Sequence, residues 1–209
     1  MKLIIKDKEP AEWKAFRETP GAKYKANKSL RQSLYKEQGG ICAYCMQRLD
    51  DNLSKRNTHN RIEHIKSEAG YPQLQLVYSN MIMCCNGLTL ENKHCDLAKE
   101  NKEISFSPLD NGFIESLSYR TSDGTIISSN AIWNEEINKV LNLNAAPLKS
   151  NRKKTLKGII NCLTRRHEKW RMRDLKREID NWSNKDADGL YYPYCGMVIW
   201  FLNKKLNIR

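Results

Sequence analysis

The sequence predicts an α+β fold in which a small metal-binding core of strands and short helices is embedded in a mostly helical surround. Three observations predict it. Five of the seven cysteines fall between Cys42 and Cys95. A strand-like alternation lies between the two halves of this cysteine cluster. Helical periodicity dominates the chain before and after it.

Length and composition describe a globular protein. The chain has 209 residues, enough for one sizeable buried core or a compact core with an appended piece. We divide it into a metal-binding core with N-terminal helices at residues 1–110 and an accessory, partner-docking region at residues 111–209. Apolar residues make up 40% and charged residues 29%, which excludes disordered and fibrous classes. No run suits a membrane span and no signal-peptide cleavage site follows the start, so we expect a cytoplasmic protein.

Helical spacing begins near the start of the chain. Trp13 and Phe16 are three apart, as on one face of a helix, and a Pro-Gly pair follows. A second helix is predicted over residues 29–38, with Leu30 and Leu34 turned inward and two glycines as its end. This helix delivers the chain to the first cysteine pair.

The cysteine spacing favours a metal over disulfides. A CxxC pair in a chain that looks intracellular, with an odd number of cysteines, is typical of a zinc knuckle. A structural zinc ion takes four nitrogen or sulfur ligands in a tetrahedron. The ligands we expect are Cys42, Cys45, Cys85 and Cys95. Cys84 remains an alternative to Cys85, and His94 is an alternative fourth ligand.

The segment between the cysteine pairs contains the polar residues of interest. Residues 61–66 alternate as a strand would, residues 80–85 read as a turn into a short helix, and residues 93–101 read as another helix. Glu63 and His64 lie on the predicted strand. Asn80 follows sixteen residues after His64, and Asp96 comes directly after a cysteine.

The accessory region reads as a hairpin followed by helices. Asp123-Gly124 marks the tip of a hairpin over residues 115–130. Helices follow over residues 131–143 and from Pro147 onward, and the second has an apolar face at helical spacing. The tail, residues 190–206, is a helix apolar nearly all round, which is either buried in the core or docked on another protein; burial is the commoner outcome.

The formal net charge of +12 indicates a polyanionic partner, because Lys and Arg displace counterions from a phosphate backbone. Between residues 152 and 173 there are nine Lys or Arg and one acid, Glu168. This stretch is either a solvated helix face or a surface that follows phosphates. The residues we expect to contact nucleic acid are Lys99, Arg152, Lys153, Lys154, Arg165 and Arg166.

The residue types of the central segment suit phosphodiester hydrolysis, which needs a base for water and a divalent cation for the phosphate. His64 is neutral near pH 7 and can take the proton. Glu63 and Asp96 offer hard oxygen ligands for magnesium or manganese. Asn80 could fix the imidazole through an amide or backbone hydrogen bond.

The order of a CxxC pair, an acid-His pair, an Asn, a Cys and a final Cys-Asp-x-x-Lys resembles the HNH endonucleases of the ββα-metal class. In that family two strands and a helix carry the site and a zinc knuckle supports it. The resemblance implies that His64 is the general base, that Glu63 and Asp96 bind the catalytic metal, and that Asn80 is structural. Asp96 departs from the family, where many relatives have His or Asn.

More narrowly, the chain resembles the PtuB-like nucleases of Septu and retron-associated phage-defence systems. The opening with Pro10 and Trp13, the run LRQSLYKEQGGICAYC, the element HCDLAKEN and the hydrophobic tail carry this resemblance. It implies an antiviral effector that cuts nucleic acid, with DNA as the expected substrate and a PtuA-like, ABC-type ATPase as partner. In a retron version, a reverse transcriptase and its RNA-DNA product join them.

The expected function is therefore a metal-dependent HNH endonuclease with structural Zn²⁺ and catalytic Mg²⁺ or Mn²⁺. The alternative from another class is a non-catalytic zinc-ribbon module that binds nucleic acid or bridges a complex. Such a module would keep the cysteines without requiring Glu63, His64 and Asp96 together. An inactive homologue held for assembly is a third interpretation.

Overall fold

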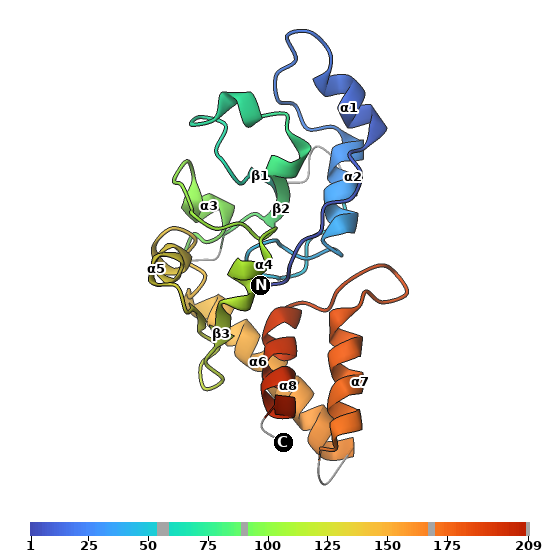
Figure 1. Cartoon of the computed structure of the whole chain (residues 1–209), viewed down its shortest axis with the longest axis vertical. Helices are drawn as coiled ribbons and strands as arrows, with labels where there is room; N and C mark the ends of the chain where they lie inside the picture. Colours follow the sequence, from blue (N-terminus) through green and yellow to red (C-terminus); the bar gives the residue numbers. More distant parts are fainter. Residues whose placement is uncertain (54–58, 89–91, 167–169, 208–209) are drawn as a thin grey trace.

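Two small antiparallel sheets and a series of helices make up the computed structural model, which describes residues 1–53, 59–88, 92–166 and 170–207 (Figure 1). This mixture confirms the α+β class. The elements are α1 (Ala11–Arg17), α2 (Lys28–Glu37), β1 (Asn60–His64), β2 (Met81–Cys85), α3 (Asp96–Lys99), α4 (Asn111–Glu115), β3 (Leu117–Tyr119), β4 (Ile126–Ser128), α5 (Ala131–Lys139), α6 (Ala146–Arg166), α7 (Met172–Ser183) and α8 (Cys195–Asn207). Short 3-10 turns occupy Pro72–Leu74 and Tyr78–Asn80.

Strands β1 and β2 pair antiparallel, with His64 opposite Met81. The prediction of a turn into a short helix at residues 80–85 is therefore wrong: the turn is present, but a strand follows it. All five residues of β2 are buried, and a continuous apolar run does not by itself distinguish a buried strand from a buried helix. Residues 81–85 form a strand because both sides of their backbone have partners. Strand β1 pairs with one edge of β2, and the Gln38 side chain makes two 2.7 Å hydrogen bonds with the backbone of Met83.

The two N-terminal helices are confirmed. Helix α1 buries Trp13 completely, and the Trp13 indole donates a hydrogen bond to the carbonyl of Leu76 (3.2 Å). Helix α2 begins at Asn27, whose side chain accepts from the Leu30 amide (2.8 Å), as a polar N-cap residue should. The first helix thus packs on the segment between β1 and β2.

The accessory region is bonded to the metal-binding core. The amide of Tyr191 donates to the carbonyl of Gly39 (2.9 Å), and that of Tyr194 donates to Met46 (3.0 Å). Gly39 has a φ of 55° and lies against the Tyr191 ring, so a side chain there would collide with it. The segment after α7 therefore closes over the end of α2.

The helices of the accessory region bury their apolar faces. The predicted hairpin forms as β3 and β4, and the tail helix α8 is buried against α6 and α7, which confirms the commoner outcome (Figure 1). Helix α7 was not predicted as a separate element, and Glu168 lies outside the described residues. Among the described residues, no helix has the length and apolar character needed to cross a membrane.

Arg152 is not a surface residue, so its prediction as a nucleic-acid contact is wrong. It lies on the inward face of α6, four residues before the buried Leu156. Its guanidinium donates to the carbonyls of Gly124 (2.6 Å) and Leu143 (2.7 Å) and to the side chain of Asn144 (3.1 Å). Arg152 thereby joins α6 to the tip of the β3-β4 hairpin.

Replacing Arg152 by Met should lower the free energy of unfolding by about 2–4 kcal/mol, because the buried carbonyls of Gly124 and Leu143 lose the guanidinium that donates to them. Lys153→Met is the matched control, since the neighbouring Lys153 is exposed. Urea unfolding followed by circular dichroism measures both. Equal stability of the two variants would contradict the structural role of Arg152.

Candidate functional site

Four cysteine thiols converge as the spacing predicts. The sulfur atoms of Cys42, Cys45, Cys85 and Cys95 all lie within 4.8 Å of one another and all four residues are buried. The Cys42 and Cys95 sulfurs are 3.9 Å apart, and those of Cys45 and Cys85 are 3.8 Å apart. Zinc-sulfur bonds of about 2.3 Å give sulfur-sulfur distances of roughly 3.8 Å in a tetrahedron. The four thiols can therefore hold a metal ion such as zinc.

The choice between Cys84 and Cys85 follows from the strand. Successive side chains of a strand point to opposite faces, so Cys84 and Cys85 leave β2 in different directions, and the sulfur that joins the other three is that of Cys85. His94 is not one of the four, but it is buried beside them. Its Nδ1 atom lies 3.1 Å from the sulfur of Cys95 and 3.9 Å from that of Cys85.

Burial by itself raises the pKa of a thiol, and it does so at Cys45 and Cys95. At Cys42 burial acts in the same direction, yet hydrogen bonds from the surrounding thiols outweigh it and lower its pKa well below the ordinary value. Cys42 is therefore the one of these three thiols whose surroundings favour the thiolate. That is the state in which thiols ligate a metal.

A charge quartet lies next to the cysteine cluster; we use this name for Arg61, Glu63, Asp96 and Lys99. The Lys99 ammonium lies 2.8 Å from the Glu63 carboxylate, and the Arg61 guanidinium donates to Asp96. Arg61 and Glu63 are two residues apart on β1 and so share one face, while Asp96 and Lys99 are the first and last residues of α3. The hydroxyl of Tyr44, from inside the CxxC pair, donates to Glu63 (3.3 Å).

The two carboxylates of the quartet interact directly. Burial raises the pKa of Glu63 to about 8, and a hydrogen bond with Asp96 acts in the same direction, whereas Lys99 opposes it. Two adjacent, buried carboxylates repel each other when ionised, and a divalent cation relieves that repulsion. The chemistry of this donor pair therefore fits Mg²⁺ or Mn²⁺, although each carboxylate already has a cationic side chain as partner.

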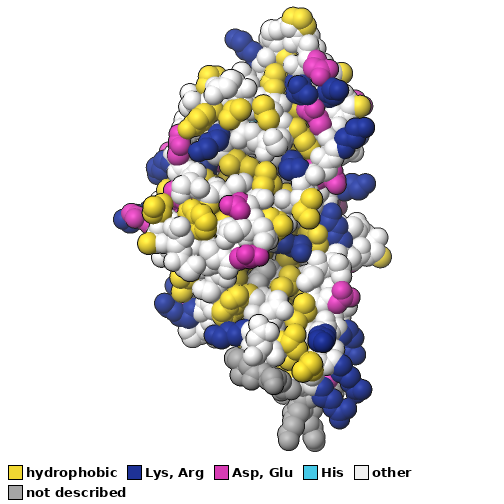
Figure 2. Space-filling view, viewed as in Figure 1, with side chains coloured by type: hydrophobic (Ala, Val, Ile, Leu, Met, Phe, Trp, Pro, Cys, Tyr) yellow, Lys and Arg dark blue, Asp and Glu magenta, His cyan; other side chains and the backbone are white. Residues whose placement is uncertain are grey.

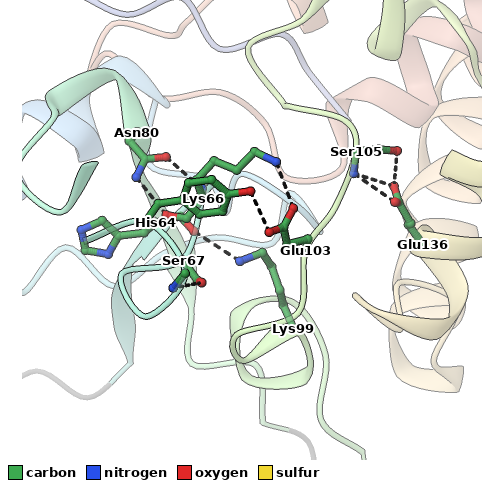
Figure 3. Close-up of polar contacts among 10 residues, drawn as sticks. His64, Lys66, Ser67, Asn80, Lys99, Glu103, Ser105 and Glu136 are labelled. Atoms are coloured by element: carbon green, nitrogen blue, oxygen red, sulfur yellow. Dashed lines mark hydrogen bonds and ion pairs between the residues drawn. The ribbon is translucent and has the colours of Figure 1, made fainter. Parts of the chain in front are cut away.

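Lys99 was expected to contact nucleic acid, and that prediction is wrong. Its side chain is fully buried, with 0% of the residue exposed. Its ammonium donates to Glu63. It also donates, at 3.3 Å, to the backbone carbonyl of His64 (Figure 3). A phosphate on the surface cannot reach it.

The His64 ring is held in one orientation. Its Nε2 atom lies 2.9 Å from the carbonyl oxygen of Gln75, and the Tyr24 ring packs edge-on against it with centroids 4.6 Å apart. A carbonyl oxygen only accepts, so Nε2 carries the hydrogen in this bond. In the neutral ring, Nδ1 then keeps the lone pair that a base requires. The residue is 7% exposed, which shields the ring from bulk water.

Asn80 bonds the backbone and not the imidazole itself, so of the two expected ways of fixing the ring the structure shows the indirect one. Its side-chain oxygen accepts from the Lys66 amide (2.9 Å), and its amide nitrogen donates to the Lys66 carbonyl (3.0 Å) (Figure 3). The same nitrogen donates to the carbonyl of Leu74 (3.3 Å). These bonds close the loop over residues 65–79, which we call the His64 loop. Because Gln75 follows Leu74, Asn80 supports the carbonyl that orients His64.

The His64 ring and the Glu63 carboxylate leave β1 on opposite faces, as strand alternation requires. Burial raises the pKa of Tyr24 to about 12, and the charge of Asp96 contributes to this increase. Tyr24 is the residue that packs on His64. Lys99 links Glu63 and His64: its ammonium bonds the Glu63 carboxylate (2.8 Å) and the His64 backbone carbonyl (3.3 Å), and Asp96 lies in the same short helix, α3.

Four residues that contact His64, Glu63 or Asp96 were not predicted from the sequence: Tyr24, Tyr44, Arg61 and Gln75. Arg61 was recoverable, because alternation places it on the same face as Glu63. Tyr44 had a weaker signal, a large aromatic residue inside a metal-binding turn. Tyr24 and the Gln75 carbonyl had none, since a loop conformation brings them to His64.

No protein-family profile matches the chain, and no curated protein matches it. The fold and the site therefore define the protein by themselves. It is an α+β protein in which a four-cysteine centre able to hold a metal ion such as zinc lies beside a histidine and two buried carboxylates.

Replacing Cys85 by Ala should remove the bound metal and unfold the core, because a structural zinc site contributes on the order of 10 kcal/mol. Cys84→Ala is the matched control: it deletes the neighbouring buried thiol, which is not one of the four clustered sulfurs. Metal content by mass spectrometry and the melting temperature test both. Loss of zinc from the Cys84 variant, or retention in the Cys85 variant, would contradict the ligand assignment.

Proposed function

We propose that this protein is a metal-dependent endonuclease that hydrolyses phosphodiester bonds in nucleic acid, as HNH endonucleases do. The supporting observation is the fixed His64 ring, with its Nδ1 lone pair available, on the strand that also carries Glu63, whose carboxylate interacts with Asp96. A base and a carboxylate pair are the two requirements of this chemistry.

We further propose that the four-cysteine centre holds structural Zn²⁺. Its ligands come from the turn after α2, from the end of β2 and from the residue before α3. Holding these three pieces together fixes β2, and with it β1, against α3. Glu63 on β1 and Asp96 on α3 then meet in one geometry.

His64 would take a proton from a water molecule through Nδ1 as the water oxygen bonds to phosphorus. The phosphorus bond to the leaving oxygen breaks, and solvent protonates that oxygen. The Gln75 carbonyl stabilises the positive charge that develops on the ring. Glu63 and Asp96 would hold Mg²⁺ or Mn²⁺, which supplies positive charge at the scissile phosphate.

The exposed cations of α6 and α7 provide a surface for the substrate backbone. Lys153, Lys154, Arg165 and Arg166 are exposed on α6, and α7 adds Arg173, Lys176 and Arg177. Figure 2 shows Lys and Arg side chains gathered at the lower right of the molecule, over the position of α7. Clustered cations of this kind gain affinity for a phosphate backbone by counterion release.

The resemblance to PtuB-like nucleases extends the proposal to the cell. In that setting the protein would be the effector of an anti-phage system, acting on DNA. A PtuA-like, ABC-type ATPase would restrain or activate it. A retron version would add the reverse transcriptase and its RNA-DNA product.

Replacing His64 by Ala should lower cleavage of plasmid and single-stranded DNA by at least about 100-fold, because the base is removed. Zinc content should not change, since His64 is not a zinc ligand. His59→Ala is the control, since His59 is an exposed histidine shortly before β1. The assay contains Mg²⁺ or Mn²⁺ and is run with and without the ATPase.

Equal cutting by wild type and the His64 variant would contradict the assignment of the base. An absence of cutting by wild type under every condition, with nucleic acid still bound, would favour the non-catalytic zinc module instead.

Replacing both Lys153 and Lys154 by Gln should weaken DNA binding. The slope of the logarithm of the binding constant against the logarithm of the salt concentration should become shallower by about one for each phosphate that the two side chains no longer neutralise. Fluorescence anisotropy of the His64→Ala protein measures binding without cleavage. Lys8→Gln with Lys14→Gln removes the same charge from exposed positions at the α1 end. Equal weakening by this control pair would contradict a substrate surface on α6.

A further inference from the structure

Lys99 is the most constrained cation of the charge quartet. Its amide donates to the carbonyl of Cys95, one of the four clustered cysteines (2.9 Å), within a helix of only four residues. The residues on either side of this helix, Cys95 and Glu100, have φ values of 55° and 52°. The backbone of Lys99 is thus fixed relative to the cysteine centre.

The two cations of the quartet differ in their freedom. The Arg61 side chain is 50% exposed and can turn into solvent, whereas the Lys99 side chain is 1% exposed. Lys99 has two acceptors within reach, the Glu63 carboxylate at 2.8 Å and the His64 carbonyl at 3.3 Å. A buried ammonium is retained where it is paired and hydrogen-bonded, and both conditions hold here.

The formal charges of the quartet sum to zero, because two carboxylates face two cations. A divalent cation that binds Glu63 and Asp96 would therefore meet carboxylates whose negative charge Lys99 and Arg61 already neutralise. The Lys99 ammonium is within hydrogen-bonding distance of Glu63 and would repel such a cation across a short, poorly screened distance.

We propose that Lys99 is an internal cation that competes with the divalent metal for Glu63 and so keeps the metal affinity of the site low. This inference rests on the proposed assignment of Glu63 and Asp96 as metal ligands. It adds a regulatory property to that assignment: the carboxylates are held in place without metal, and metal binds only when its concentration suffices to overcome the ammonium.

The test is Mn²⁺ binding to the full-length, zinc-loaded protein, measured by electron paramagnetic resonance of free Mn²⁺. Lys99→Met removes the charge and keeps an unbranched side chain, and it should tighten binding by at least about tenfold. Glu63→Gln should abolish binding at this site. Lys139→Met is the matched control, because it removes the same charge from an exposed pair with Glu135, and it should bind as wild type does.

A second variant keeps the inference testable if Lys99→Met does not fold. Lys99→Gln retains N–H donors toward Glu63 and the His64 carbonyl without the charge, and it should show the same tightening of about tenfold. The double variant Glu63→Gln with Lys99→Met removes both partners of the buried pair, so it should fold better than Lys99→Met alone and bind no Mn²⁺ at the site.

The outcomes separate this inference from the proposed function. Binding that Glu63→Gln abolishes, but that Lys99→Met and Lys99→Gln leave unchanged or weaken, overturns the role of Lys99 and preserves the metal site. No binding by any protein, Lys99→Met included, overturns both the role of Lys99 and the assignment of the metal ligands.

Discussion

The convergence of four thiols is the constraint on which the rest of this core depends. Strands β1 and β2 have five residues each and α3 has four, lengths at which isolated elements are not stable. The cysteines belong to three segments that span residues 42 to 95. A metal bound by them closes a long loop and supplies free energy that these short elements lack.

That constraint allows unfavourable groups to be buried beside it. Glu63 and Lys99 are both removed from water, which costs free energy that their pairing offsets only when the geometry is good. Tyr44, within the CxxC pair, donates to Glu63, and α3 begins next to Cys95. The cysteine centre therefore orients the charge quartet from two sides, which explains how so short a helix can present both Asp96 and Lys99 accurately.

The orientation of His64 depends on the backbone more than on any side chain. Asn80 closes the His64 loop, and the loop presents the Gln75 carbonyl to the ring. Trp13 of α1 donates to Leu76 in the same loop, so the N-terminal helices also support this position. An imidazole held by a main-chain carbonyl keeps one tautomer, because that oxygen cannot donate.

Local periodicity and motif spacing determined much of this protein from sequence alone: the N-terminal helices, the β3-β4 hairpin, the buried tail helix and the cysteine set. These features depend on residues close in sequence or on ligand types that have few other uses. Tertiary structure alone decided that residues 81–85 form a strand, that Lys99 and Arg152 are buried, and that Asn80 holds a loop. In each of those cases the partner lies outside the local pattern, and burial with that partner outweighs what the pattern indicates.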